Sequence, residues 1–69
     1  MQESAMSRLE RFRIDRGLTK AELAERAGVS RDVVTAIELR KPRRVRSLTL
    51  ARLARALGVG VEELMEDAA

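Results

Sequence analysis

The chain has 69 residues with no cysteine, no histidine, one aromatic residue and a net charge of +3. This length supports one small domain, and the composition excludes disulfides, thiolate or imidazole metal ligands and the usual general base. No apolar run reaches the roughly 18 residues of a membrane span, and no signal-peptide pattern opens the chain. We therefore expect a cytoplasmic protein that needs no cofactor or metal and is not an enzyme.

The segment that begins at Ser7 predicts a first helix. Ser7 is an N-cap candidate, Glu10 three residues later completes a capping-box pattern, and Gly17 ends the segment. Leu9 and Phe12 are three residues apart and form a narrow apolar stripe, which we interpret as core packing.

A second helix is predicted over 20–27. Thr19 precedes it as the N-cap candidate, and Glu22 completes a T-x-x-E capping box. Gly28 follows the last good helix former and can adopt the left-handed conformation that ends many helices.

A third helix is predicted from Arg31, with Ser30 as its N-cap. Val33, Val34 and Ile37 would form its buried side. Two short helices joined by a three-residue turn that contains glycine form a helix-turn-helix, whose second helix can enter the major groove of DNA.

The remaining chain predicts two more helices. Pro42 cannot continue the third helix, and Ser47 or Thr49 is the expected cap of a fourth helix over 48–57. Its apolar residues repeat at helical spacing: Leu50, Leu53, Ala54 and Leu57. A short fifth helix over 61–66 is expected after Gly60. The predicted fold is all-α, with five helices around one core.

Charge is distributed unevenly along this domain. The segment 40–46 holds five basic residues and no acid, whereas 61–69 holds four acids and no base. A concentrated basic segment favours an anionic partner that binds to one face of the protein. We expect residues 1–6 to form a frayed N-terminus, 7–66 the domain and 67–69 a C-terminal tail.

The sequence resembles the Cro and phage-repressor type of helix-turn-helix regulators, the xenobiotic-response-element family. The residues that carry the resemblance are Gly17-Leu18-Thr19, Glu22-Leu23-Ala24, Gly28-Val29-Ser30, Ile37-Glu38, Leu53-Ala54 and Ala56-Leu57-Gly58-Val59. The match extends over about 9–65. It implies a lambda-repressor-like fold and a DNA-binding regulator, most often a repressor.

The resemblance implies that the third helix, about 30–39, reads bases in the major groove. The matching outward positions are Arg31, Asp32, Thr35 and Ala36. Arginine can bridge guanine O6 and N7, aspartate can accept from cytosine N4, and threonine can meet several bases. Alanine offers only apolar contact.

The resemblance also implies contacts to the DNA backbone from the start of the second helix, the cap of the third and the following loop. The matching residues are Thr19, Lys20, Ser30, Arg40, Lys41, Arg43, Arg44 and Arg46. Lys20 stands where the family usually has glutamine. Arg40 stands where the family has a helix-ending glycine, and the following loop is about two residues longer than in compact phage proteins.

One further pair follows from the resemblance. Arg13 and Glu38 match a partly buried salt bridge that ties the first helix to the end of the third. Since Glu38 borders the buried side of its helix, it needs such a partner. We interpret the pair as structural.

The expected partner is double-stranded DNA with an inverted-repeat operator, which a homodimer of this protein binds. We expect no membrane partner and no small-molecule substrate. The apolar residues expected at the dimer interface are Val59, Val61, Leu64 and Met65. The alternative is an antitoxin-type interaction module that holds a partner protein and regulates its own synthesis through DNA.

Overall fold

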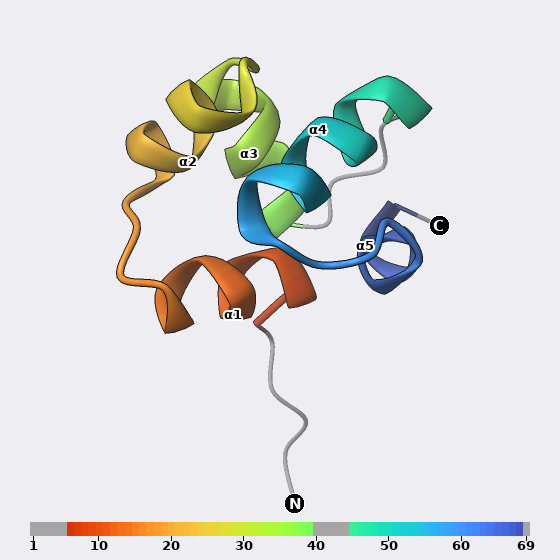
Figure 1. The fold of residues 1–69 in the computed structure, drawn as a ribbon, viewed down its shortest axis with the longest axis horizontal. Helices are drawn as coiled ribbons and strands as arrows, with labels where there is room; N and C mark the ends of the chain where they lie inside the picture. The colour runs from red at the N-terminus through yellow and green to blue at the C-terminus, as the bar shows by residue number, and fades with distance from the viewer. Residues whose placement is uncertain (1–5, 40–44, 69) are drawn as a thin grey trace, which may run out of the picture.

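The computed structural model describes residues 6–39 and 45–68, and this part of the chain contains five helices and no strand. The helices are α1 (Arg8–Asp15), α2 (Lys20–Ala27), α3 (Arg31–Glu38), α4 (Ser47–Leu57) and α5 (Glu62–Ala68). Helices α2 and α3 lie together on one side of the molecule, while α1, α4 and α5 complete the bundle (Figure 1). The predicted all-α fold is confirmed.

Every helix contributes to the core. Among the described residues, the largest fully buried apolar side chains comprise one from each helix: Leu9, Leu23, Val34, Leu53 and Leu64. Phe12 packs against this cluster and is partly buried, as its spacing from Leu9 predicts. A single shared core therefore holds the two helices of the helix-turn-helix against the other three.

The first three helices start at the predicted caps. The hydroxyl oxygens of Ser7 and Ser30 accept hydrogen bonds from the backbone N–H groups of Glu10 (3.1 Å) and Val33 (3.2 Å). Thr19 and Glu22 form the complete reciprocal capping box before α2. These caps satisfy N–H groups that have no partner within their helix.

The fourth helix begins differently from the prediction. Arg46 is its N-cap residue, without a side-chain cap hydrogen bond, and Ser47 is already helical, so the expected cap by Ser47 or Thr49 is wrong. Val45, which precedes the cap, and Leu50 both pack into the core. These are the two positions of a hydrophobic staple, and apolar anchoring sets the start of α4 in place of a hydroxyl.

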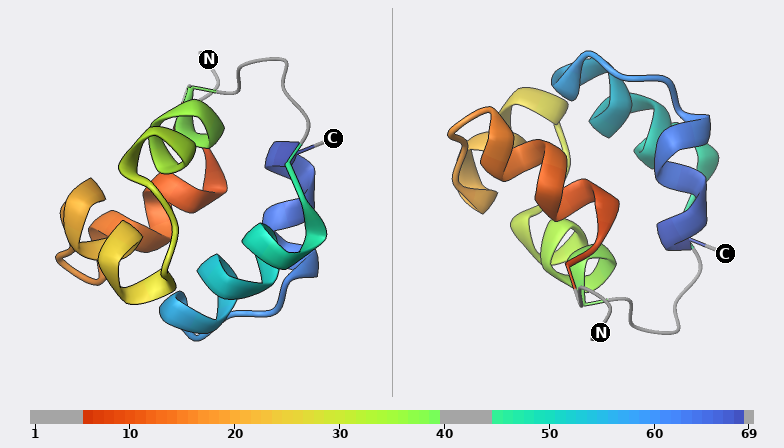
Figure 2. Two further views of the ribbon diagram at one scale, coloured as in Figure 1. Left: turned by 90° about the horizontal axis from the view of Figure 1, so that it is seen from above. Right: turned by 90° about the horizontal axis from the view of Figure 1, so that it is seen from below.

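The bounds of two other helices also differ from the prediction. Helix α3 ends at Glu38 with Leu39 as its C-cap, one residue short of the expected end. Helix α5 begins at Glu62 and continues to Ala68, and Figure 2 shows it on the opposite side of the bundle from α2. No helix in 6–39 or 45–68 has the length and hydropathy needed to cross a bilayer.

Candidate nucleic-acid interface

The N-terminus of α2 is held rigidly and faces solvent. The Oγ1 atom of Thr19 accepts from the Glu22 N–H (3.0 Å), and Oε1 of Glu22 accepts from the Thr19 N–H (2.8 Å). This backbone hydrogen bond lowers the pKa of Glu22 below its ordinary value, so the capping box is complete at neutral pH. Thr19 is exposed and Lys20 half-buried. Thr19 and Lys20, which we expect to contact the DNA backbone, therefore stand at a helix N-terminus that the capping box holds in place.

The turn between α2 and α3 is closed by hydrogen bonds on both sides. Gly28 has a φ of +73°, a conformation that residues with a side chain rarely adopt. The Val29 N–H donates to the Ala24 carbonyl (3.0 Å), and Nη1 of Arg52 donates to the Gly28 carbonyl (3.3 Å). Ser30 then caps α3, so the turn has the three residues that the sequence predicts.

Helix α3 presents a narrow outward face. Val34 and Ile37 are buried and Val33 packs against the core, whereas Arg31 and Asp32 are exposed. Thr35 is half-buried and lies one turn after Arg31. The exposed Arg31 and Asp32, a cation and an anion, therefore stand in the first turn of the helix, next to the Ser30 cap.

The expectation that Ala36 faces outward is wrong, because only 9% of its surface is exposed. Helix α3 packs against α1 and α5 as well as α2, so its covered side is wider than the valine and isoleucine spacing indicates. Ala36 lies at the edge of that covered side. Its small side chain serves packing.

Leu39 is a candidate that the sequence reasoning missed. It is 58% exposed, and it follows Thr35 by four residues and Arg31 by eight, the spacing of one helix face. That spacing from Arg31 was the available signal. We call Arg31, Asp32, Thr35 and Leu39 the outward face of α3. It combines a cation, an anion, a hydroxyl and an apolar group.

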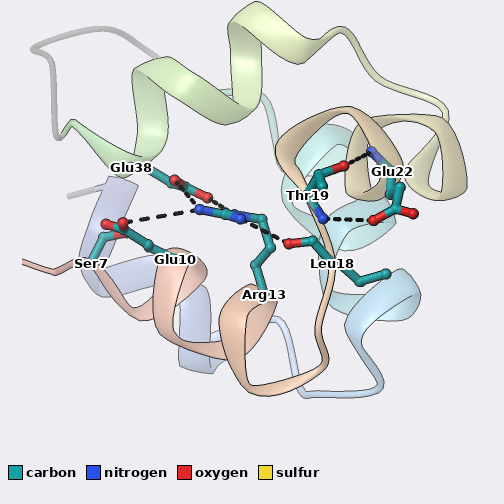
Figure 3. Close-up of polar contacts among 7 residues, drawn as sticks. All are labelled: Ser7, Glu10, Arg13, Leu18, Thr19, Glu22 and Glu38. Carbon is teal, nitrogen blue, oxygen red and sulfur yellow. Dashed lines mark hydrogen bonds and ion pairs between the residues drawn. The ribbon is translucent and has the colours of Figure 1, made fainter.

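The Arg13–Glu38 pair is present and more extensive than expected (Figure 3). Nε of Arg13 donates to Oε2 of Glu38 (2.6 Å) and Nη2 donates to Oε1 (3.1 Å). Nη1 of Arg13 also donates to the backbone carbonyl of Leu18 (2.8 Å). The hydrogen bond to Glu38 raises the pKa of Arg13. This guanidinium therefore contacts both ends of the helix-turn-helix.

The basic segment is only partly within the described residues. Arg46 is exposed at the start of α4, so it can reach an anion. The other predicted backbone-contact residues of this segment, Arg40, Lys41, Arg43 and Arg44, lie outside the described residues.

The expected dimer interface is corrected in part. Leu64 is fully buried and cannot meet a second chain, and Val59 is half-buried against the core. A short helix such as α5 docks through its apolar side, and Leu64 is that anchor. Val61 and Met65 are 38% and 54% exposed and remain available. Leu48, which the prediction omitted, is 61% exposed in the first turn of α4.

The described residues contain no group of three or more histidine, cysteine, aspartate or glutamate side chains that could hold a metal ion. The observed geometry is that of a helix-turn-helix protein: a capped helix, a three-residue turn and a second helix with an exposed polar face.

The comparison with protein families agrees with this class. Residues 8–69 match the Cro/C1-type HTH DNA-binding domain, and the chain belongs to this family of DNA-binding regulators. No curated protein matches the chain. The crystal structure of a hypothetical transcription factor, NHTF from Neisseria, is similar with 32% identity and a TM-score of 0.73. The similarity covers 83% of this chain but only 63% of that protein.

Proposed function

We propose that this protein is a sequence-specific repressor that inserts α3 into the major groove of double-stranded DNA. The observation that carries the proposal is the outward face of α3, whose Arg31, Asp32 and Thr35 combine donors and acceptors that distinguish base pairs. Repression follows from occupation of an operator. The similar protein from Neisseria, a hypothetical transcription factor, supports a role in transcription.

In the proposed complex, Arg31 bridges guanine O6 and N7 and Asp32 accepts from the amino group of cytosine. Thr35 contacts a neighbouring base, and Leu39 meets a thymine methyl group. Ala36 is not among the base contacts, because it is buried.

Selection of bound duplexes from a random pool tests the proposal. We expect enrichment of an inverted repeat with G·C pairs at the positions that face Arg31. The matched control is Arg31→Ala carried through the same selection. Absence of any enriched sequence with the wild-type protein at moderate salt would refute sequence-specific binding.

The backbone contacts in this proposal come from two places. Thr19, Lys20 and Ser30 stand at the N-termini of α2 and α3, where helix dipoles and N–H groups favour phosphate. The basic segment 40–46 supplies the others through its arginines and lysine, of which Arg46 is exposed.

Simultaneous replacement of Arg43, Arg44 and Arg46 by glutamine should weaken binding to all duplexes by a similar factor. Each lost phosphate contact should reduce the slope of log affinity against log salt by about 0.9. Fluorescence anisotropy across a salt series measures the slope. A control with the exposed Arg8, Arg11 and Arg26 neutralised removes the same charge from other surfaces. Equal slopes for the two variants would show that segment 40–46 makes no specific phosphate contact.

We propose a dimer on DNA, because α3 covers half of an operator and two such helices reach successive major grooves about 34 Å apart. Val61 and Met65, which are both exposed, are the expected contact. A contact this small predicts a free protein that dimerises weakly.

A full inverted repeat should bind more than twice as tightly as an isolated half-site, with a sigmoidal titration. Met65→Glu should remove this gain, since it places a charge in the contact, while leaving half-site affinity unchanged. Gel-shift titrations with both duplexes measure the difference. Tight half-site binding without any gain from the second half-site would contradict the dimer.

A further inference from the structure

The guanidinium of Arg13 connects the two ends of the helix-turn-helix from outside it. One edge is bonded to the Leu18 carbonyl, immediately before the Thr19 cap of α2. The other edge is bonded to both carboxylate oxygens of Glu38, the last residue of α3. Figure 3 shows the guanidinium between these two partners.

The network is buried, so its geometry is tightly constrained. The side chain of Arg13 is 11% exposed and that of Glu38 only 2%. A planar guanidinium presents its donors in fixed directions, so three bonds to two partners leave it little freedom. The positions of Leu18 and Glu38 relative to each other are therefore set by one rigid group on α1.

Stability alone does not explain such a pair. Well-packed apolar residues of similar volume often replace a buried ion pair without loss of stability. What an apolar pair cannot supply is the directed bond to the Leu18 carbonyl. Together with the Leu18 N–H, which donates to the Arg13 carbonyl (3.1 Å), that bond holds the chain at the entry to α2, one residue before Thr19 and two before Lys20.

We propose that Arg13 is a positioning residue for DNA binding, which holds the phosphate-contacting start of α2 in register with the recognition helix α3. Arg13 itself acts through Leu18 and Glu38 and needs no contact with DNA. This inference rests on the proposed function, because it assumes that Thr19 and Lys20 contact phosphate while α3 occupies the groove.

The test uses the double variant Arg13→Met/Glu38→Leu, which removes both charges and keeps an apolar contact between α1 and α3. Far-ultraviolet circular dichroism first establishes that it is folded. Affinity is then measured by anisotropy on the duplex selected by the wild-type protein, across a salt series. Arg11→Met is the matched control, because Arg11 is an exposed arginine on the same helix.

We expect the double variant to lose about tenfold in affinity and about 0.9 to 1.8 in salt slope, equivalent to one or two phosphate contacts. Lys20→Ala should weaken the wild-type protein but have little further effect in the double variant. Such coupling between two residues whose side chains are not bonded is the signature of positioning. Arg11→Met should keep the wild-type slope apart from a small general charge effect.

Additive effects of Lys20→Ala and the double variant, or an unchanged salt slope, would overturn the inference. If the double variant does not fold, Arg13→Lys serves instead, because one ammonium group cannot bond Leu18 and Glu38 with the same geometry. Arg13→Lys should show the same coupling to Lys20→Ala with a smaller coupling energy. Additive effects of Arg13→Lys and Lys20→Ala on affinity would again overturn the inference. Absence of binding by the wild-type protein would refute the proposed function.

Discussion

Replacing Glu38 with alanine should destabilise the domain by about 3–5 kcal/mol, the typical cost of removing one partner from a buried pair. Glu38 is 5% exposed and accepts two hydrogen bonds from Arg13, at 2.6 and 3.1 Å. Without the carboxylate, the Arg13 cation stays buried next to a cavity. A domain of 69 residues has a total stability of only about 3–10 kcal/mol, so a large fraction of the variant should be unfolded at 37 °C.

Chemical unfolding followed by circular dichroism measures this loss. Glu10→Ala is the control, because the Glu10 carboxylate lies 4.0 Å from the same arginine but is 30% exposed. Such an exposed pair should contribute less than about 1 kcal/mol. The variant Arg13→Met/Glu38→Leu should recover part of the lost stability, because it removes the unpaired charge but leaves the Leu18 carbonyl without its donor. Similar losses for Glu38→Ala and Glu10→Ala would show that the buried pair has no special energetic role.

Arg31→Ala should cost about 1–3 kcal/mol of binding free energy at the preferred operator and relax selection at one G·C pair. The unfolding free energy should change by no more than about 0.5 kcal/mol, because Arg31 is exposed and outside the core. Binding to the selected duplex and to a duplex substituted at that base pair measures the discrimination. Arg11→Ala provides an exposed arginine control. Equal weakening on both duplexes would identify Arg31 as a phosphate contact.

Asp32 provides the opposite charge in the same helical turn. Asp32→Ala removes a carboxylate that repels phosphates, so non-specific affinity should rise while discrimination between duplexes falls. Its stability cost should be a few tenths of a kcal/mol, since an acid in the first turn favours the helix dipole. A fall in non-specific affinity would contradict this assignment.

Much of the local structure could be predicted because its causes lie within a few residues. Thr19 and Glu22 specify the start of α2 through bonds between neighbours, and Gly28 specifies its end through its own backbone freedom. Ser30 starts α3 in the same way. These rules also place Arg31 and Asp32 in an exposed first turn, so the centre of the candidate site was predictable.

Errors occur where a distant contact decides. Ser47 has the chemistry of a cap, yet it is the first residue of α4 and Arg46 is the N-cap, because Val45 and Leu50 then both pack into the core. Leu64 has the chemistry of an interface residue, yet α5 uses it as its anchor. In each case the residue type is compatible with both roles, and packing against other helices selects one.

The sequence by itself determined the class of fold, the helix-turn-helix and its caps, because backbone hydrogen bonding and helical periodicity act over one or two turns. The pairing of Arg13 with Glu38 was also anticipated, through the family resemblance. Only the tertiary structure decided that Ala36 is covered and that Arg13 also holds the Leu18 carbonyl. Those outcomes depend on how α1 and α5 lie against α3, and the angle between two helices is set by the whole core, which no local pattern encodes.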